Sequence, residues 1–421
     1  MILGRVPLAL AFSRRRDYGH FSPAGKQIVL MALRSLLVIL SLCPLVYYIL
    51  SLYDIIGYFR SIRRLPPRDD AFAPPVSILK PVRGVDSEAY DNFASYCRLN
   101  YPVYEIIFAV TDPSDPIVPV IEKLQRDFPN TRIRLATSVE RLGQNNKISN
   151  LYRLVKEAEY ELLAMSDSDV RVGPDYLREL VGAFADAEVG AVTSFYRCAG
   201  GGTLAADLAM LGMCSDSLPS ALIARKLEGG VQFAFGWTMA TTKERLAEIG
   251  GWESMADHHS DDFELGNRIA RQGHRVEIMR EVVSVVFPRE TLRQLFGQEL
   301  RWAIGLRNVR PVAYAGMIFT HGLPWMVLAA IVAGAAGWTG IAVAYLAAYL
   351  ILRISVAWTA GVWGLRDETI VKKLWLLPLR DAVTSVVWML GLVSDRISWR
   401  GSEFRVKNGL LTPVAREPRQ Q

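Results

Sequence analysis

Hydrophobic residues form long runs near both ends of the chain and alternate with polar residues in its middle. Residues 28–59 contain the first run, and residues 311–395 contain the others. A helix needs about 20 predominantly apolar residues to cross a bilayer. The N-terminal run meets this length and is far longer than the apolar core of a secretory signal. It therefore predicts an uncleaved transmembrane anchor.

The C-terminal hydrophobic region predicts further membrane segments. Two of its runs, residues 312–336 and 341–363, are each long enough to span. A third run, residues 374–393, contains Arg380 and Asp381. Ionisable side chains are costly in hydrocarbon, so this run is expected to span poorly, to re-enter, or to lie at the interface. The pattern predicts an integral, multi-pass membrane protein with three to four membrane segments.

The middle of the chain, residues 74–288, repeats short apolar segments and amphipathic segments in turn. This alternation is typical of a parallel sheet covered by helices on both faces, and it predicts an α/β, Rossmann-like domain. Residues 289–310 follow as an amphipathic helix that suits the membrane interface. The strands are predicted at residues 76–79, 105–110, 132–135 and 161–165, with helices at residues 87–97, 117–128 and 147–158.

Charge and composition narrow the class of protein. The 421-residue chain is 51% hydrophobic with a formal net charge of +6, and basic residues gather beside the apolar runs, in an N-terminal segment (residues 1–27) and a basic tail (residues 396–421). Arg60, Arg63 and Arg64 favour the cytoplasmic side for the middle domain, although the basic N-terminus competes for that side. No basic run interleaved with aromatic residues lies in the middle, so no nucleic-acid partner is predicted. The four cysteines are widely spaced, which indicates neither disulfides nor a CxxC metal site.

Carboxylates follow two of the predicted strands. Asp167 and Asp169 come directly after the strand at residues 161–165, and Asp112 follows the strand at residues 105–110. In open α/β sheets the ligand crevice lies outside the carboxyl ends of the strands. Carboxylate oxygens there suit Mg²⁺ or Mn²⁺ that also binds a diphosphate, and Asp112 is a candidate to bind the nucleotide. The alternatives are a solvated Asp-rich turn for the pair and a turn residue for Asp112.

Three further candidates lie at predicted helix starts. Lys147 and Asn150 offer an ammonium and an amide to a nucleotide, with an ordinary helix cap as the alternative. Asp262 lies in the first turn of a helix near residues 260–270. A one-step sugar transfer needs a general base that takes the proton of the acceptor hydroxyl, and a carboxylate at a helix start is stabilised in its ionised form. Simple helix capping is the alternative.

The amphipathic segment carries one more candidate group. Gln298, Arg301 and Trp302 have i, i+3 and i+4 spacing, so they share one face of the helix. An arginine there would neutralise a departing diphosphate, and a tryptophan would form the floor of an acceptor pocket. The alternative is an interfacial pair in which the arginine snorkels to water beside the tryptophan.

Taken in order, these residues resemble a known family. Asp112, the Asp167–Asp169 pair, Asp262 and the QELRW segment at 298–302 resemble the signature of membrane-bound, inverting glycosyltransferases of GT-A fold. Four further segments resemble the ceramide glucosyltransferase family: VSILKPVRGV at 76–85, NNKISN at 145–150, DSDVRV at 167–172 and ISWRG at 397–401.

The resemblance implies transfer of glucose from UDP-glucose to the primary hydroxyl of ceramide, with a divalent metal (Mg²⁺ or Mn²⁺) as cofactor. It implies that Asp112 contacts the nucleotide, that Asp169, with Asp167 nearby, holds the metal–diphosphate, and that Asp262 is the base. Gln298, Arg301 and Trp302 would close the site. Bacterial hopanoid-linked N-acetylglucosaminyltransferases share nearly all of these motifs, and processive polysaccharide synthases share the QxxRW segment. The acceptor lipid and the donor sugar therefore stay open, and a non-enzymatic lipid-binding protein is a further alternative.

Overall fold

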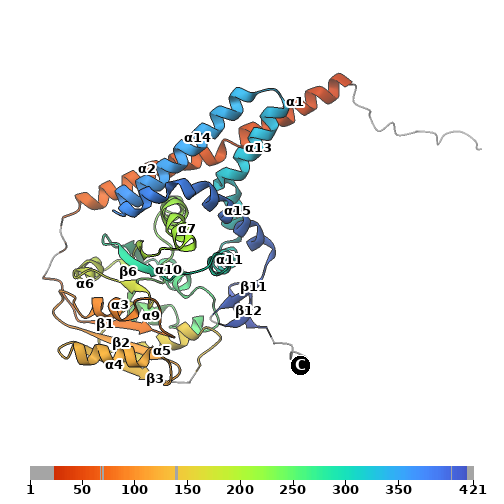
Figure 1. Cartoon of the computed structure of the whole chain (residues 1–421). Coiled ribbons are helices and arrows are strands. Elements are labelled where there is room, and N and C mark those ends of the chain that lie inside the picture. The colour runs from red at the N-terminus through yellow and green to blue at the C-terminus, as the bar shows by residue number, and fades with distance from the viewer. Residues whose placement is uncertain (1–22, 67, 69–70, 138–140, 400, 415–421) are drawn as a thin grey trace, which may run out of the picture.

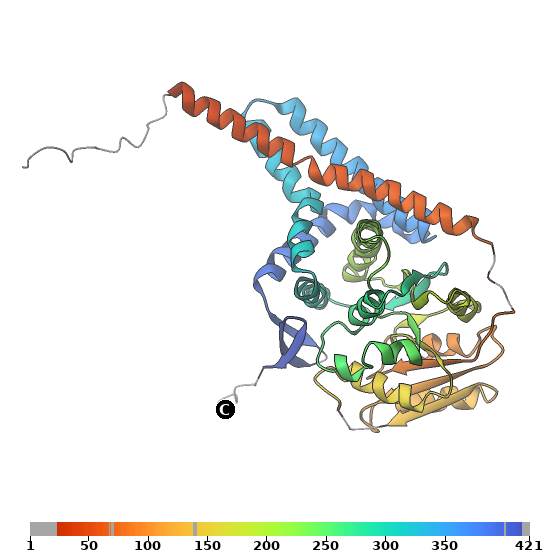
Figure 2. The same cartoon turned by 180° about the vertical axis from the view of Figure 1, so that it is seen from behind.

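The computed structural model describes residues 23–66, 68, 71–137, 141–399 and 401–414. Residues 1–22 of the predicted basic segment 1–27 and residues 415–421 of the predicted tail lie outside the described residues. The described chain has a globular α/β part and a group of long helices that extends away from it (Figures 1 and 2).

The main sheet has seven strands in the order β3-β2-β1-β4-β8-β6-β9. β1 pairs in parallel with β2 and β4, and β2 pairs in parallel with β3, as the alternating pattern predicted. The expectation of an all-parallel sheet is wrong at β8, which runs antiparallel to both β4 and β6. The reason is that the chain returns to the sheet at the edge where β4 ends, with Met239 opposite Met165. The strands are β1 Val76–Pro81, β2 Tyr104–Val110, β3 Arg132–Thr137, β4 Leu162–Met165, β6 Val189–Thr193, β8 Met239–Thr242 and β9 Arg275–Ile278.

The helices of this domain begin and end close to the predicted positions. α5 starts where the Asn145 side chain accepts hydrogen bonds from the backbone amides of Lys147 and Ile148, which satisfies two otherwise unpaired donors. α5 then packs against β1 and β2 through a buried apolar face. The helices are α3 Ala89–Tyr96, α4 Val118–Asp127, α5 Asn146–Glu157, α6 Tyr176–Val181, α9 Lys243–Glu248 and α10 Asp261–Arg271.

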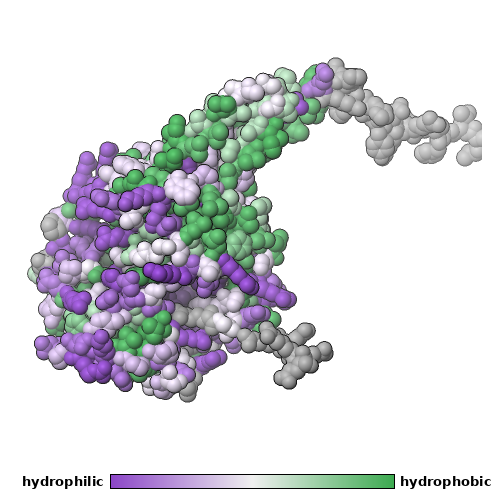
Figure 3. Space-filling view, viewed as in Figure 1, coloured by the Kyte–Doolittle hydropathy of each residue, from purple (hydrophilic) through white to green (hydrophobic). Residues whose placement is uncertain are grey.

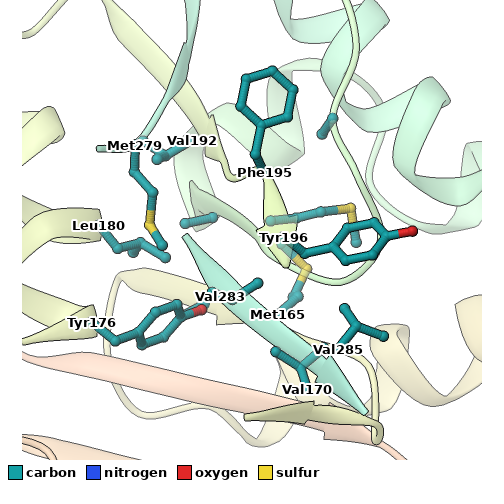
Figure 4. Close-up of a cluster of buried hydrophobic side chains, with 14 of the residues drawn as sticks. Met165, Val170, Tyr176, Leu180, Val192, Phe195, Tyr196, Met279, Val283 and Val285 are labelled. Atoms are coloured by element: carbon teal, nitrogen blue, oxygen red, sulfur yellow. The ribbon is translucent and has the colours of Figure 1, made fainter. Parts of the chain in front are cut away.

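A second, three-stranded sheet lies beside the first, in the order β5 (Val170–Arg171), β10 (Val283–Phe287) and β7 (Tyr196–Gly200). Figure 4 shows the apolar side chains that gather where these elements meet, including Met165, Val170 and Tyr196. Met165 and Val170 are fully buried. The turn between β4 and β5, which carries the predicted metal-binding aspartates, is therefore anchored at both ends in packed core.

The long helices supply three candidate membrane spans by length and composition, or four if a bent pair is counted as one span, which matches the predicted three to four. The first combines α1 (Pro23–Leu40) and α2 (Cys43–Arg64), which follow nearly one line in Figure 2. Figure 3 shows hydrophobic residues along these helices and hydrophilic residues over much of the globular part. The protein is thus a membrane protein. The second candidate is α14 (Thr339–Trp358) with its extension to Gly364, and the third is Glu368–Val393, which includes α15 (Leu377–Val393). The bent pair consists of Pro311–Thr320 and α13 (Gly322–Ala335).

The run predicted to be long enough to span, residues 312–336, is bent by 50° at His321. Tyr48 of the N-terminal anchor accounts for this break. Its hydroxyl donates to the Thr320 carbonyl at 3.2 Å and accepts from the Gly322 amide at 3.0 Å. Backbone groups that leave a helix inside a membrane protein need such partners, because hydrocarbon offers none.

The amphipathic segment forms α11 (Leu292–Val309), and Thr291 and Gln294 make a capping box at its start. The basic tail adds an element that was not predicted from the sequence, because three strands within residues 396–399 and 402–413 form an antiparallel sheet. Alternate residues of this sheet, such as Phe404 and Val406, pack on Ile304 of α11. Its strands are β11 Arg396–Trp399, β12 Ser402–Lys407 and β13 Leu410–Pro413.

Candidate active site

The carboxyl ends of β2, β1 and β4 lie side by side, and hydrogen bonds join the loops that follow them. The Gly84 amide, after β1, donates to both oxygens of Asp115, after β2, at 2.9 and 3.0 Å. The Ser168 hydroxyl, after β4, donates to Asp86, after β1. The predicted common edge is confirmed, and these loops form one connected platform.

Asp112 stands on the exposed outer part of this platform. Its carboxylate accepts hydrogen bonds from the amide and the hydroxyl of Ser114 at 2.8 and 2.7 Å. These hydrogen bonds lower the pKa of the Asp112 carboxyl. The geometry is that of an Asx turn, which leaves the carboxylate ionised and open to solvent. Its contact with a nucleotide stays a prediction.

Gly236 marks the point where Asp167, one of the two predicted metal-binding aspartates, and the predicted base meet. A Cβ atom built on Gly236 would lie 3.0 Å from the Lys147 ammonium, 3.3 Å from Asp167 Oδ2 and 3.4 Å from Asp262 Oδ2. The Gly236 amide donates to Asp262 Oδ2 at 3.0 Å. Side chains that follow a strand, begin α5 and begin α10 thus converge on one glycine.

Lys147 links the two groups of carboxylates. Its ammonium lies 2.8 Å from Asp167 Oδ1 and 2.9 Å from Asp261 Oδ2. Burial lowers the pKa of the Lys147 ammonium, but Asp167, Asp261 and Asp262 outweigh burial and raise this pKa above its ordinary value. Lys147 therefore stays charged. Asn150, one helical turn further along α5, accepts a hydrogen bond from the Thr111 hydroxyl at 3.3 Å, beside Asp112.

Two carboxyl groups in the site have raised pKa values. Burial, followed by the charges of Asp167 and Asp86, raises the pKa of Asp169 to about 7. Burial and the neighbouring Asp261 raise the pKa of Asp262 to about 6, against the opposing effect of Lys147. Perturbed carboxyls that gather in one place are typical of functional sites.

The donor set at Asp167 and Asp169 fits a hard divalent cation. The charges around Asp169 repel one another, and a cation would relieve that repulsion. Within residues 23–414, the described parts hold no group of three His, Cys, Asp or Glu side chains arranged for a metal. One or two carboxylates are nevertheless what Mg²⁺ uses when substrate phosphates complete its coordination.

α11 packs against the loop that leads into α10. A Cβ atom on Gly305 would lie 2.8 Å from His259 Nδ1, so the His259 ring packs directly against the backbone of α11. Burial and the nearby Arg301 lower the pKa of His259 to about 4. The Arg301 guanidinium also lies 5.5 Å from the ring centroid of Trp399 in β11. The structure thus brings Arg301 near His259, in the loop that leads to α10 and Asp262.

The structure gives Gln298 and Trp302, the other two predicted residues of this motif, no contact that assigns them a role in the site. Trp302 is 45% exposed, and Gln298 is half-buried on the same helix. Exposure of a large aromatic side chain leaves room for a ligand against it, but the expected acceptor floor stays a prediction, as does the role of Gln298.

Three residues that were not predicted from the sequence shape the site: Gly236, on which its side chains converge, and Asn145 and Lys80, which support it from behind. The Asn145 side chain donates to the His258 carbonyl at 2.8 Å, which ties the start of α5 to the loop before α10. The Lys80 ammonium donates to the Asp167 carbonyl at 2.7 Å and lies 4.0 Å from the ring centroid of Tyr96. The available signals were a cap-type residue before a helix, a lysine in an apolar strand, and a glycine in a strand-like aromatic segment.

The fold and the site together define a GT-A domain joined to membrane helices. A mannosyltransferase from Pyrobaculum calidifontis, solved in complex with GDP-Man and Mn²⁺, has this fold. It matches 82% of this chain and 99% of its own chain at a TM-score of 0.50 and 18% identity. The chain belongs to glycosyl transferase family 21, whose sequence profile matches residues 36–412.

Curated relatives carry matching names. Ceramide glucosyltransferase 1 of Caenorhabditis elegans is 25% identical over 257 residues, which is 60% of this chain and 55% of the relative. The ceramide glucosyltransferase of Candida albicans is 32% identical over 119 residues, 25% of this chain and 22% of the relative. The chain spans about half the length, or less, of the curated relatives it matches.

Proposed function

We propose that this protein transfers glucose from UDP-glucose, with inversion, to the primary hydroxyl of ceramide. Family membership and the names of the relatives support the reaction class. The observation that carries the proposal is the convergence of Asp167, Lys147 and Asp262 around Gly236. A metal–diphosphate site and a base for the acceptor must lie this close if a sugar is to pass between them in one step.

The donor half of the proposed site is the platform of strand ends. Asp112 and Asn150 lie where the nucleotide would bind, and Asp169 and Asp167 would hold Mg²⁺ or Mn²⁺. When bound, the cation would neutralise the charge that develops on the departing diphosphate. Lys147 contributes a fixed positive charge beside Asp167, and Arg301 would contribute a second from α11. Fixed charges that already point at the leaving group stabilise the transition state most effectively.

The acceptor half depends on Asp262. Its Oδ2 accepts from the Gly236 amide at 3.0 Å and its Oδ1 accepts from the Phe263 amide at 2.8 Å, so the carboxylate is held in one orientation. A pKa of about 6 leaves it ionised at neutral pH. As the acceptor oxygen bonds to the anomeric carbon, the bond to the UDP oxygen breaks and the hydroxyl proton passes to Asp262. Attack from the face opposite UDP inverts the anomeric configuration.

The membrane helices would present the lipid acceptor. The proposal places the α/β domain on the cytoplasmic side, which the basic residues at the end of α2 favour. The lipid headgroup would reach the site beside α11 while its tails stay in the hydrocarbon. Trp302 and Gln298 would line this approach.

Asp262→Asn tests the assigned base. Transfer should fall to background, while binding of UDP-glucose should persist because Asp262 belongs to the acceptor half. Glu264→Gln, two residues further along the same helix and therefore on a different face, is the matched control and should keep its activity. Loss of donor binding in the Asp262 variant would contradict the assigned role.

Incubation of the purified protein with labelled UDP-glucose or UDP-N-acetylglucosamine, and with ceramide or a hopanoid, tests the substrates. A single glucose on ceramide is the expected product. N-acetylglucosamine on a hopanoid, or a long glycan chain, would replace the proposal with one of the alternatives.

A further inference from the structure

A cavity of about 670 Å³ lies between α2 and α8 (Leu218–Leu227), away from the carboxylates of the candidate active site. α2 and α8 pack side by side, and the hydroxyls of Tyr47 and Ser220 are 3.0 Å apart. Apolar side chains such as Ile56 and Leu222 form part of the wall. None of the residues assigned to donor, metal or base lines it.

The wall of this cavity is positively charged. Arg60, Arg225 and Lys226 line it with one carboxylate, Asp54. Lys226 pairs with Asp54 at 2.7 Å, and the Arg225 guanidinium lies 5.6 Å from the ring centroid of Tyr58. Across the parts of the chain that the structure describes, neither Arg60 nor Arg225 has a carboxylate within 4.0 Å. Two positive charges therefore face the cavity without a balancing anion.

Asp54 adds a second, independent feature. Its side chain is only 10% exposed, and its Oδ2 is buried without a hydrogen-bond partner. A buried carboxylate oxygen without a donor is costly, so a hydroxyl group that binds in the cavity would gain by donating to it. The cavity thus offers two cations for an anion and one acceptor for a hydroxyl.

The cavity lies beside the C-terminal part of a candidate membrane span. The candidate span of the anchor ends at Arg64 and the span that includes α14 ends at Gly364. The two spans pack together near these ends, where the ring centroids of Phe59 and Trp363 are 6.0 Å apart. Arg60 lies about one helical turn before the end of this candidate span, in its basic last part with Arg63 and Arg64. Lipid headgroups occupy a layer of about 5–8 Å on each side of the hydrocarbon.

We propose that this cavity binds the headgroup of an anionic glycerophospholipid of the phosphatidylglycerol type. Its phosphodiester would lie against Arg60 and Arg225, a free headgroup hydroxyl would donate to Asp54, and the glycerol backbone would rest on the apolar wall. Basic pockets beside membrane helices are typical sites for anionic lipid headgroups, and here α2 supplies the membrane helix and α8 the opposite wall. The inference does not depend on the donor or acceptor of the proposed reaction.

Native mass spectrometry of the full-length protein tests the proposal, with titration of phosphatidylglycerol or phosphatidylcholine in neutral detergent. Wild type should bind phosphatidylglycerol in preference to phosphatidylcholine. Arg60→Gln/Arg225→Gln should weaken phosphatidylglycerol binding by about tenfold or more, the loss expected for two charge-assisted hydrogen bonds. Arg60→Gln alone, which keeps the packing of Arg225 on Tyr58, should give part of this loss.

Arg64→Gln is the matched control, because Arg64 is an exposed arginine of the same helix that does not line the cavity. Its phosphatidylglycerol binding should match that of wild type. An equal loss in Arg64→Gln would show diffuse attraction to the basic surface and would overturn the proposal. Binding of soluble glycerol 3-phosphate as tight as that of the lipid would also overturn it, since the site would then recognise free phosphate rather than a lipid.

Discussion

A buried network of charges joins the QELRW segment of α11 to the membrane helices, and its disruption is the strongest stability prediction. Arg380 of α15 makes an ion pair with Glu299 of α11 and another, at 3.0 Å, with Asp216. Asp216 lies in the π-helical turn Met213–Ser217 between α7 (Leu204–Gly212) and α8. Arg353 of α14 pairs with Asp216 and, at 2.6 Å, with Asp381. Ionisable residues predicted to make residues 374–393 span poorly are thus neutralised inside the protein.

The size of the effect follows from burial. Arg380 and Glu299 are each 8% exposed. Burial raises the pKa of Asp216, but Arg353 and Arg380 outweigh burial and lower it to about 2. Arg380→Met would leave both Glu299 and Asp216 without this cation. Removal of one partner from a buried ion pair costs about 3–5 kcal/mol, because the remaining charge has lost its solvent and its partner.

Chemical denaturation of the purified protein in detergent measures this cost. Arg380→Met should lower the free energy of unfolding by about 3–5 kcal/mol. The double variant Glu299→Gln/Arg380→Met should recover part of this loss, because the Glu299 carboxylate that would otherwise be buried without a partner is removed. Arg153→Gln is the control. It breaks a partly exposed pair with Glu157 one turn away on α5 and should cost less than about 1 kcal/mol. A loss below about 1 kcal/mol for Arg380→Met would refute the reasoning.

Three further outcomes are expected. Gly236→Ala should lower kcat by about tenfold or more with a small change in melting temperature, because its Cβ would displace Lys147, Asp167 and Asp262. Steady-state kinetics and a thermal melt measure these two effects. An unchanged kcat would contradict the convergence of these side chains on Gly236. The logarithm of kcat/KM should rise with pH up to about 6 and then level off, since the ionised form of Asp262 accepts the proton; a rate that falls as pH rises through 6 would count against that role. Chelation of divalent cations should abolish UDP-glucose binding in equilibrium dialysis, and Mg²⁺ or Mn²⁺ should restore it; metal-independent binding would exclude the assignment of Asp167 and Asp169.

Local patterns in the sequence determined most of the secondary structure of the α/β domain. Apolar runs such as residues 105–110 predict buried strands, because an extended segment buried on both faces has no polar side to show. Cap-type residues and charged first turns place helix starts to within a few residues. Because apolar runs show where strands end, Asp112 and Asp167 are recognisable from the sequence as carboxylates that follow strands. The alternation of strands and helices then predicts that both lie at the same edge of the sheet.

Tertiary structure alone decided how distant segments meet. The sequence does not show that β8 would run antiparallel, that Gly236 would bring Asp262 to Asp167, or that Arg380 would pair with Glu299. Each of these depends on which surfaces pack together over long separations in the chain. A residue's own neighbours in sequence determine its backbone preference, but a charge or a glycine acquires its role only from partners that folding brings within a few ångströms.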